Sequence, residues 1–524
     1  MIKDNLHIGQ DARVRLISGI RRSAEAVGGT MGTGGSNALL EAIESPGHLM
    51  TNDGATILES IHFADPLEEM GRKILFEAVS RANKSSGDGS STTTVLCASI
   101  LEEGLKHLDT NSPMLIKKSL EECVPFIEES IKNQTRVITV DEVGAVAAIS
   151  AEDEGIGNTI QEIYKEIGPK GIIYWDISKT ADDSYKIGKG ITVDGAGYAS
   201  PYMCDMDEKT GGFTNLARWS NPDILITKQK ITTAAEFEKL FSTLNRDGRN
   251  EIVIFCDEID PVAITQLVQT RLVRGFKTMV VKMPVLWKDW WYEDLAAATG
   301  AVVIDPNVGV KHDNITVDML GKVGNIVVTK DDTYMDGIKD VTLHVQRLEE
   351  DGTDEGKIRA ARLSTRTARY YVGAQSDSAL SYRRLKVEDA INAAHHALNG
   401  GVVAGGGVAL AEAVFNMPDT PGGGILSEAL LAPYRQILKN AGIPENPKRI
   451  DEFKHSPCEE SIGIDTRTGK EVNMFDAHIT DPATVVVNAA KNAISVAAAV
   501  LTAKTVVELP KDHELQNTQP MPRV

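Results

Sequence analysis

The chain has 524 residues, 42% of them hydrophobic and 25% charged, and a formal net charge of −19. That length is too great for one hydrophobic core, so we expect about two to four domains. The negative charge excludes nucleic acid and anionic lipid surfaces as partners, because like charges repel. The five cysteines are scattered without a CxxC pair, which favours reduced thiols and argues against a zinc site.

Neither a membrane span nor a secretion signal is expected. The chain lacks an unbroken apolar run of about 18 residues, the length that a membrane helix needs. The N-terminal segment MIKDNLHIGQDARVRLI lacks the apolar stretch of a signal peptide. We therefore expect the protein to stay in the compartment where it is made.

The first third of the chain predicts helices. Asp11 is placed to cap a helix that Gly28 and Gly29 end. Its apolar face at helical spacing is Val14, Ile17, Ile20, Ala24 and Val27. Asp65 and Pro66 predict the start of a second helix, because Asp caps and Pro fits the first helical position. The core face of that helix is Leu67, Met70, Ile74 and Ala78, and a third helix is predicted from near Ser91.

The middle of the chain alternates short apolar runs with helical stretches, which is the βαβ pattern of an α/β domain. The predicted strands are Gly171–Ile177, Asp223–Thr227, Glu251–Cys256, Thr278–Met283, Ala301–Asp305 and Asn325–Thr329. Helices are predicted at Ala234–Leu244 and Ala263–Val273, and again near the end at Lys386–Ala397 and Thr484–Thr502. Helical layers around an α/β insert predict a discontinuous domain. The polar tail from Lys511 is expected to be disordered.

A loop rich in glycine and hydroxyl groups precedes the third helix, where Ser86–Thr94 reads SGDGSSTTT. Helix N-termini bind phosphate through free N–H groups and a partial positive charge. Asp88 offers the hard oxygen ligand that suits Mg²⁺. Taken alone, the segment fits a capped helix after a flexible loop equally well. It is not a Walker A loop, because GxxxxGK[ST] occurs nowhere in the chain.

Other segments offer single chemical groups. The glycines of Gly29–Gly35 permit close approach of backbone to a ligand, or simply end a helix. Asp53 and Asp389 each offer a carboxylate that could orient water or hold a cation, or could lie in an ordinary turn or on a solvated helix face. The Gly405–Gly407 triplet and the segment Asp476–Asp481 could likewise belong to a ligand site or to an ordinary turn.

These pieces occur together and in order, and in that combination they resemble the group I (GroEL-type, 60-kDa heat-shock protein) chaperonins. The segments that carry the resemblance are TMG from Thr30, TNDG from Thr51, GDGSSTTT from Gly87, ISAE from Ile149, YASPY from Tyr198, KVEDA from Lys386, GGVVAGGGVAL from Gly400 and DPATV from Asp481. The resemblance extends from Asp11 to Lys511.

The resemblance implies the multidomain chaperonin fold. A mainly α equatorial domain that binds ATP would comprise residues 1–134 and 401–524. A small α/β intermediate hinge domain would comprise 135–189 and 366–400, and an α/β apical client-binding domain 190–365 would be inserted in the chain.

The resemblance also implies roles for individual residues, with ATP, Mg²⁺ and K⁺ as cofactors. Asp389 would activate the attacking water, Asp53 would lie near the γ-phosphate, and Asp88 would bind Mg²⁺. The implied ATP-binding residues are Thr30, Met31, Gly32, Thr33, Asn52, Asp53, Asp88, Gly89, Ser90, Ser91, Thr92, Ile149, Gly405, Gly406, Ile479 and Asp481. The implied client-binding residues are Tyr198, Tyr202, Met203, Phe237, Leu240, Phe241, Leu244, Ile264, Leu267 and Val268.

The implied function is that of an ATP-dependent molecular chaperone that binds unfolded polypeptides and promotes their folding. Its partners would be further copies of the chain, in a single or double heptameric ring, in a bacterial or virus-infected bacterial cytoplasm. The main alternative is a chaperonin-fold holdase or scaffold with weak ATP cycling and no co-chaperonin. A small-molecule kinase is a third hypothesis, although no acceptor-site constellation is visible.

The chain departs from the family pattern at several places. Asn52 stands where the family has lysine, and Asp465-Thr466-Arg467 replaces the adenine contact. Thr365-Arg366 replaces a glycine pair at the upper hinge, which predicts a smaller or differently directed apical swing, whereas the other hinge keeps Gly188 and Gly190. The tryptophan-rich segment Lys282–Trp291 is consistent with core, client site or subunit contact. These changes count against use of a co-chaperonin.

Overall fold

The structure is a computed structural model that describes residues 6–41, 48–86, 88–178, 180–206, 213–284, 288–351, 353–364, 366–456 and 460–507. It divides into two compact units. Unit 1 comprises Met1–Lys165, Trp175–Ser184 and Tyr371–Val524, and unit 2 comprises Glu166–Tyr174 and Tyr185–Tyr370. The chain therefore leaves unit 1, builds unit 2 and returns. Gly87, Thr365, Trp287, Cys458 and the tail from Lys511 lie outside the described residues.

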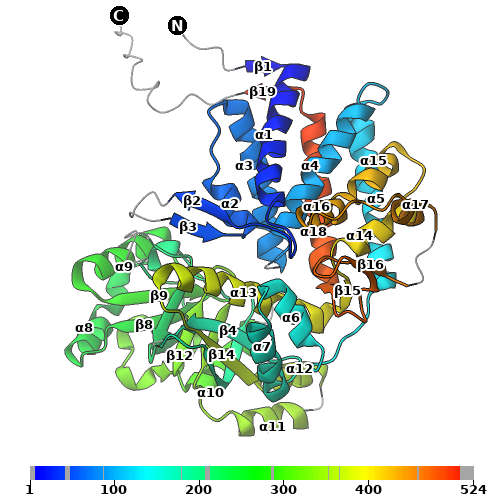
Figure 1. Cartoon of the computed structure of the whole chain (residues 1–524). Coiled ribbons are helices and arrows are strands. Elements are labelled where there is room, and N and C mark those ends of the chain that lie inside the picture. The colour runs from blue at the N-terminus through cyan, green and yellow to red at the C-terminus, as the bar shows by residue number, and fades with distance from the viewer. Residues whose placement is uncertain are drawn as a thin grey trace, which may run out of the picture. The chain divides into compact units, whose positions relative to one another are not determined.

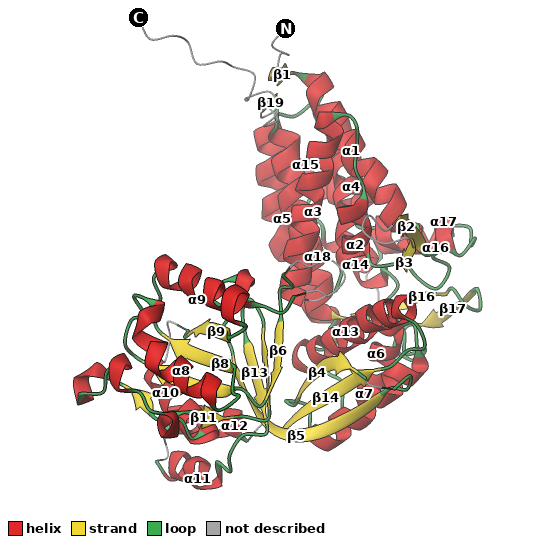
Figure 2. Cartoon of the chain, turned by 90° about the vertical axis from the view of Figure 1, so that its left-hand side faces the viewer, coloured by secondary structure: helices red, strands yellow, loops and turns green. Residues whose placement is uncertain are grey.

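Unit 1 is mainly helical, and its long helices form one bundle (Figures 1 and 2). Helices α1, α3, α4, α5 and α18 pack on one another around a shared hydrophobic core. The helices that lie in unit 1 or begin there are α1 (Gln10–Gly28), α2 (Gly54–Ser60), α3 (Pro66–Ser86), α4 (Ser90–His107), α5 (Pro113–Gln134), α6 (Val143–Ala151), α7 (Glu154–Ile167), α13 (Asp377–Gly400), α14 (Val408–Glu412), α15 (Pro421–Ala429), α16 (Ala432–Asn440), α17 (Pro447–His455) and α18 (Ala483–Thr502).

A local sequence signal explains where α3 begins, whereas the prediction for the start of α1 is wrong in detail. The Asp65 carboxylate accepts the N–H of Leu67 at 2.8 Å, as a cap before Pro66 should. Helix α1, however, begins at Gln10 after Gly9, so Asp11 lies in the first turn and is not the cap. Val14 is 47% exposed, whereas Ile17 and the apolar residues that follow it are buried. Val14 therefore lies off the core face of α1, which begins with Ala12 and Leu16.

Helix α18 is long and apolar enough to cross a membrane by length and composition. In this structure it lies against α3, α4 and α5, and most of its alanine and valine side chains are buried. A core helix of a helical bundle needs this composition, because it is covered by protein on several sides. The packing of α18 therefore accounts for its hydropathy.

Four two-stranded sheets lie at the periphery of the unit 1 bundle. They pair β1 (Leu6–Ile8) with β19 (Thr505–Val507), β2 (Ala38–Glu41) with β3 (His48–Thr51), β15 (Val402–Ala404) with β18 (Thr480–Pro482), and β16 (Ile462–Asp465) with β17 (Lys470–Asn473). All four pairs are antiparallel. The β15–β18 pair joins two segments that are distant in sequence and that both carry residues implied in ATP binding.

Unit 2 contains most of two larger sheets (Figure 2). One has the order β4-β14-β5-β13-β12-β6, with β4 (Ile172–Ile177), β5 (Ser184–Val193), β6 (Ala217–Ser220), β12 (Asn325–Val328), β13 (Thr333–Asp336) and β14 (Arg366–Val372). The other has the parallel order β10-β7-β8-β9, with β7 (Asp223–Thr227), β8 (Glu251–Cys256), β9 (Lys277–Lys282) and β10 (Val303–Ile304), and β11 (Gly321–Lys322) antiparallel to β7. The predicted βαβ alternation is confirmed by this parallel sheet.

The α-helices of unit 2 are α8 (Glu238–Arg246), α9 (Pro261–Arg274), α10 (Lys288–Thr299), α11 (Thr342–Glu350) and α12 (Asp354–Leu363). Helices α9 and α10 pack on the parallel sheet, whereas α11 and α12 pack on each other and α12 on α10. The predicted helix from Ala234 begins as the 3₁₀ helix η2 (Ala234–Phe237), which is closed by a capping box between Thr233 and Glu236, and becomes α-helical at Glu238.

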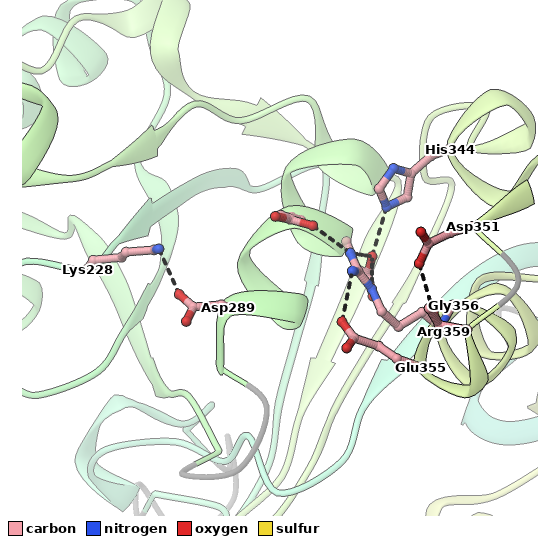
Figure 3. A network of polar contacts seen from close by, with 10 residues as sticks. Lys228, Asp289, His344, Asp351, Glu355, Gly356 and Arg359 are labelled. Atoms are coloured by element: carbon pink, nitrogen blue, oxygen red, sulfur yellow. Dashed lines mark hydrogen bonds and ion pairs between the residues drawn. The ribbon is translucent and has the colours of Figure 1, made fainter. Parts of the chain in front are cut away.

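A buried polar network ties α11 and α12 to α10 (Figure 3). The Arg359 guanidinium, 6% exposed, lies 2.8 Å from Asp294 Oδ1, and the same carboxylate contacts His344 Nε2 at 2.8 Å. Next to this network Trp291 is 3% exposed. Trp291, in the tryptophan-rich segment, is therefore a core residue.

Candidate active site

Two helix starts in unit 1 supply polar groups to one region. Gly89 has a left-handed backbone (φ 89°) and is the N-cap residue of α4, so it brings no side chain to cap the first turn at Ser90, Ser91 and Thr92. An N-terminus of this kind presents N–H groups and a partial positive charge to anions. The hydroxyls of Thr93 and Thr94, in contrast, bond to carbonyls one turn back within or just before α4.

Asp53 has a structural role as the cap of α2, in addition to any role in the chemistry of the site. Its carboxylate caps α2, accepting the N–H of Thr56 at 2.8 Å and the Thr56 hydroxyl at 2.6 Å. The cap fixes the direction of the carboxylate at the start of the helix. Asp88 is held similarly, since its carboxylate accepts the N–H of Gly89 and lies 3.4 Å from the Ser150 hydroxyl on α6.

The loop after α1 is folded tightly and held by a residue that sequence reasoning missed. The Gly35 N–H donates to the Gly32 carbonyl, and a Cβ at Gly35 would lie 2.3 Å from the Thr30 carbonyl oxygen. Asn440 on α16 donates to the carbonyls of Gly28 (2.7 Å) and Met31 (2.9 Å). A lone asparagine more than 400 positions away carries no local sequence signal.

The β15–β18 pair places the second glycine loop beside Asp481. Val403 pairs with Asp481, and the Gly405 N–H donates to the Ile479 carbonyl at 2.9 Å. The Gly406 N–H donates to the Asp481 carboxylate. Gly407 has φ 79°, and a Cβ there would lie 2.5 Å from the Tyr434 backbone nitrogen. Only glycine fits that position, because both the backbone angle and the close approach exclude a side chain.

These segments enclose a cavity of about 120 Å³. Its lining includes five residues that the resemblance implies in ATP binding: Met31, Asp88, Gly89, Thr92 and Asp481. The walls that sequence reasoning missed are apolar and come from α16 and α18: Pro433, Ile437, Val485, Val486 and Ala489. Their aliphatic character is indistinguishable from core composition in the sequence, so no pattern could have separated them.

Carboxylates converge on this region. Burial raises the pKa of the Asp88 carboxyl above its ordinary value, and Asp53 raises it further, against the opposing effects of Gly89, Ser150 and Lys386. Burial likewise raises the pKa of Asp389 well above its ordinary value, and Asp88 and Asp53 add to this effect. Burial and then Asp88 raise the pKa of Asp481 to about 7. Crowded, partly desolvated carboxylates of this kind favour a bound cation.

The donor set fits Mg²⁺ held together with phosphate. Among the described residues, no group of three or more carboxylate, His or Cys side chains is close enough to hold a metal on its own. Mg²⁺ is usually bound by one or two carboxylates plus phosphates and water, so it does not require such a cage. Asp88 beside the N-terminus of α4 supplies that arrangement.

The remaining implied nucleotide residues lie at the edge of the site. Ile149 on α6 is 38% exposed. The Thr33 hydroxyl lies 2.6 Å from that of Thr466, on the β16–β17 turn that departs from the family pattern. Asn52 does not face a phosphate-binding group: its amide donates to Glu152 at 3.0 Å.

The residues implied in client binding divide into two groups. Six are buried in the core of unit 2 in this structure, namely Met203, Phe237, Leu240, Phe241, Leu244 and Leu267, and their role in client binding stays a prediction. Phe237, Phe241 and Phe276 stack on one another under α8. Tyr198, Ile264 and Val268 are partly buried against the same core, and Tyr202 is 60% exposed.

A groove between α8 and α9 has a volume of about 380 Å³. Polar side chains contribute much of its lining: Glu238, Ser242, Asn245, Gln266, Gln269, Thr270 and Arg274. Exposed apolar side chains occur on α9, at Val262 (60%), Leu272 (61%) and Val273 (82%). The residues that the resemblance implies on α8 and α9 lie mainly on the faces that contribute to the core.

Comparison with known proteins identifies the class of this fold. A family model described as the TCP-1/cpn60 chaperonin family matches residues 24–167 and 227–511. The chain therefore belongs to the TCP-1/cpn60 chaperonin family. It is similar to two crystal structures of the chaperonin gp146 from the bacteriophage EL 2 (Pseudomonas aeruginosa), both in the presence of ATP-BeFx. The first has 17% identity and a TM-score of 0.71, and the second 18% and 0.65; each match covers 97% of this chain and 100% of the other.

Proposed function

We propose that the chain is an ATP-dependent chaperone that hydrolyses ATP at the unit 1 site. The observation that carries this proposal is the convergence of Asp53, Asp88 and Asp389 beside the N-terminus of α4. Family membership and the ATP-BeFx named for the similar phage chaperonin support it. The finer assignments are part of the same proposal: a divergent group I member with equatorial, intermediate and apical domains, at work in a bacterial or phage-infected bacterial cytoplasm.

The chemistry follows from the charges on the site. The first turn of α4 offers N–H groups to the phosphate oxygens, and Asp88 would hold Mg²⁺. When bound, Mg²⁺ supplies positive charge against the phosphoryl group. Asp389 accepts a proton from the attacking water, and Asp53 orients the phosphate end of the site. The need for K⁺ stays a prediction of the resemblance.

The first experiment is ATP hydrolysis by the purified chain with Mg²⁺ and K⁺, beside Asp389→Ala. We expect the variant to bind ATP with the wild-type Kd and to lose at least about 100-fold in kcat, the usual contribution of a general base. Asp451→Ala is the matched control, because Asp451 is an exposed carboxylate on α17 whose side chain is 74% exposed.

Two results would count against this assignment. Wild-type hydrolysis by Asp389→Ala would remove Asp389 from the mechanism. A wild-type chain that binds clients without hydrolysing ATP would favour the holdase or scaffold alternative. Stimulation by unfolded protein, and not by small hydroxyl compounds, would set aside the kinase hypothesis.

The proposed partner is further copies of this chain. The β2–β3 hairpin exposes Leu39 (67%) and Met50 (54%), which face each other across the strands. The β1–β19 pair exposes Ile8 (62%) and Val507 (53%). Two-stranded sheets with apolar faces and open edges are sites for strand addition. Two different surfaces on one chain fit a head-to-tail contact, which closes into a ring, proposed to be heptameric by resemblance.

Clients are proposed to bind unit 2 at the exposed apolar positions of α9 and at Tyr202, beside the groove between α8 and α9. Because much of that groove is polar, we propose that it binds extended backbone and polar side chains as well as apolar ones.

A further inference from the structure

A polar junction lies next to the candidate active site in unit 1. The Glu152 carboxylate accepts a hydrogen bond from the Asn52 amide at 3.0 Å and lies 3.2 Å from the Lys386 ammonium. Its three residues come from three places: the loop between β3 and α2, the end of α6, and the middle of α13. One carboxylate therefore links a loop and two helices.

Asn52 and Lys386, the two partners of Glu152 in this junction, each lie close in sequence to a carboxylate of the site. Asn52 directly precedes Asp53, the cap of α2. Lys386 lies three residues before Asp389 on α13, which places the two on adjacent turns of one face. Lys386 acts electrostatically on both Asp88 and Asp389. Movement at Glu152 would therefore be passed to Asp53 on one side and to Asp389 on the other.

The Lys386 ammonium needs this partner. Lys386 is 6% exposed, and a buried ammonium is costly unless a carboxylate or other acceptor compensates for its lost hydration. Glu152 is the carboxylate in ion-pair contact with it. The Glu152 side chain is itself 43% exposed, and these two contacts and its backbone set its position.

The backbone at Glu152 is unusual for its residue type. Glu152 ends α6 with φ 55° and ψ 27°, in the left-handed region. Glycine is the common residue at such a helix end, because a side chain costs free energy there. A glutamate at this position is disfavoured by the backbone, so a contact of its side chain has to compensate.

We propose that Glu152 is a positioning residue for the reaction: it holds Asn52 and Lys386 in one junction and thereby keeps the Asp53 loop and the Asp389 helix in fixed relation around the phosphate region. The inference rests on the proposed ATP hydrolysis. Glu152 does not touch the reacting atoms in this assignment, and it acts through Asp53 and Asp389.

The test compares Glu152→Gln, Glu152→Gly and Lys386→Met with the matched control Glu128→Gln, whose native carboxylate forms a 2.7 Å ion pair with Lys491 elsewhere in unit 1. We expect about a 10-fold loss of kcat in each Glu152 variant with an unchanged Kd for ATP, because small displacements of catalytic groups lower the rate more than binding. Glu152→Gly relieves the backbone strain, so its Tm should equal or exceed that of Glu152→Gln while its kcat stays low. If Glu152 had only a structural role, the variant with the higher Tm would also have the higher kcat.

The double variant Glu152→Gln/Lys386→Met shows whether Glu152 and Lys386 act together, as one junction, or affect kcat independently of each other. If the junction acts as a unit, its kcat loss equals that of the more damaging single variant. A loss equal to the product of the single losses would overturn the proposal, and so would wild-type kcat in Glu152→Gln.

Hydrogen exchange of the nucleotide-free protein tests the junction without catalysis. We expect Glu152→Gln, but not Glu128→Gln, to speed amide exchange in the segments 53–58 and 386–391. If the wild-type chain hydrolyses no ATP, the proposed function fails. Hydrogen exchange would then still show whether Glu152 holds the two segments in place. Unchanged exchange in both segments would overturn the proposal, whatever the ATPase activity.

Discussion

The Asp481 carboxyl group lies beside Asp88 in the pocket, and burial, followed by the Asp88 charge, raises its pKa from 3.8 to about 7. In the unfolded chain the group titrates near the lower value. Between about pH 4 and 7 the folded protein therefore holds a proton that the unfolded chain has lost. The stabilisation from this group is complete below about pH 4 and is lost as the pH rises through 7.

This linkage predicts the effect of Asp481→Asn on stability. Asparagine carries no charge at any pH. The stability of the variant should therefore fall less than that of the wild type between pH 5 and 8. At pH 8 we expect its Tm without nucleotide to exceed that of the wild type by about 2–4 °C, which corresponds to roughly 1 kcal/mol for a large domain. Thermal unfolding from pH 5 to 8 measures it, and equal pH slopes in variant and wild type would show that Asp481 titrates normally.

At the scale of elements, α10, α11 and α12 are joined by charge as well as by apolar packing. Asp294 is 2% exposed and accepts from Arg359 on α12 and contacts His344 on α11. Figure 3 shows the Arg359 guanidinium beside the Glu355 carboxylate, with which it forms an ion pair at 3.7 Å. A buried pair of this kind contributes little over an apolar pair, but the loss of one partner leaves an uncompensated charge.

Arg359→Met should therefore destabilise unit 2 by about 3 kcal/mol, measured by urea unfolding. Arg359→Met/Asp294→Leu should recover most of that loss, because neither charge is then left buried alone. Arg347→Met on the exposed side of α11 is the control and should change stability by less than about 0.5 kcal/mol. A loss in the double variant as large as in Arg359→Met would refute the argument from charge.

At the scale of the whole molecule, the proposed assembly uses the exposed apolar side chains of the β2–β3 and β1–β19 pairs. We expect the double variant Leu39→Glu/Met50→Glu to keep its helical content and to shift from rings to single subunits, because charged side chains on strand edges block strand addition. Native mass spectrometry with circular dichroism measures both properties. Leu343→Glu, at a residue of unit 2 that is 72% exposed, is the control and should assemble normally. Rings formed by the double variant would exclude the hairpin from the interface.

The predicted restriction of the apical swing is also a property of the whole molecule and stays a prediction, since Thr365 lies outside the described residues. The neighbouring strands are closely packed. A Cβ at Gly190 would lie 2.5 Å from the Met335 carbonyl oxygen and 2.6 Å from the Thr367 hydroxyl. Gly190 is therefore required by packing as well as by any hinge motion.

Much of the fold could be predicted because it depends on local rules. The strands Asp223–Thr227 and Glu251–Cys256 occur with the bounds that their apolar runs predict. Pro66 begins α3 for the capping reason given by its sequence. Periodicity failed at Val14, because apolar spacing shows that a helix has an apolar face but not which of its side chains the rest of the fold covers.

The ordered motifs of the sequence were enough to identify the family, and they include Asp88, Gly89 and Asp481, which line the candidate site. These residues can be recognised in the sequence because aspartates and glycines in this order and spacing are rare outside such motifs. The tertiary structure alone placed Ile437 and Val485 on the pocket wall and bonded Asn440 to the loop after α1. It also buried Phe237 and Leu244, and joined Asn52 to Lys386 through Glu152. These are contacts between segments far apart in the chain, and long-range packing follows from the whole core and not from any local pattern.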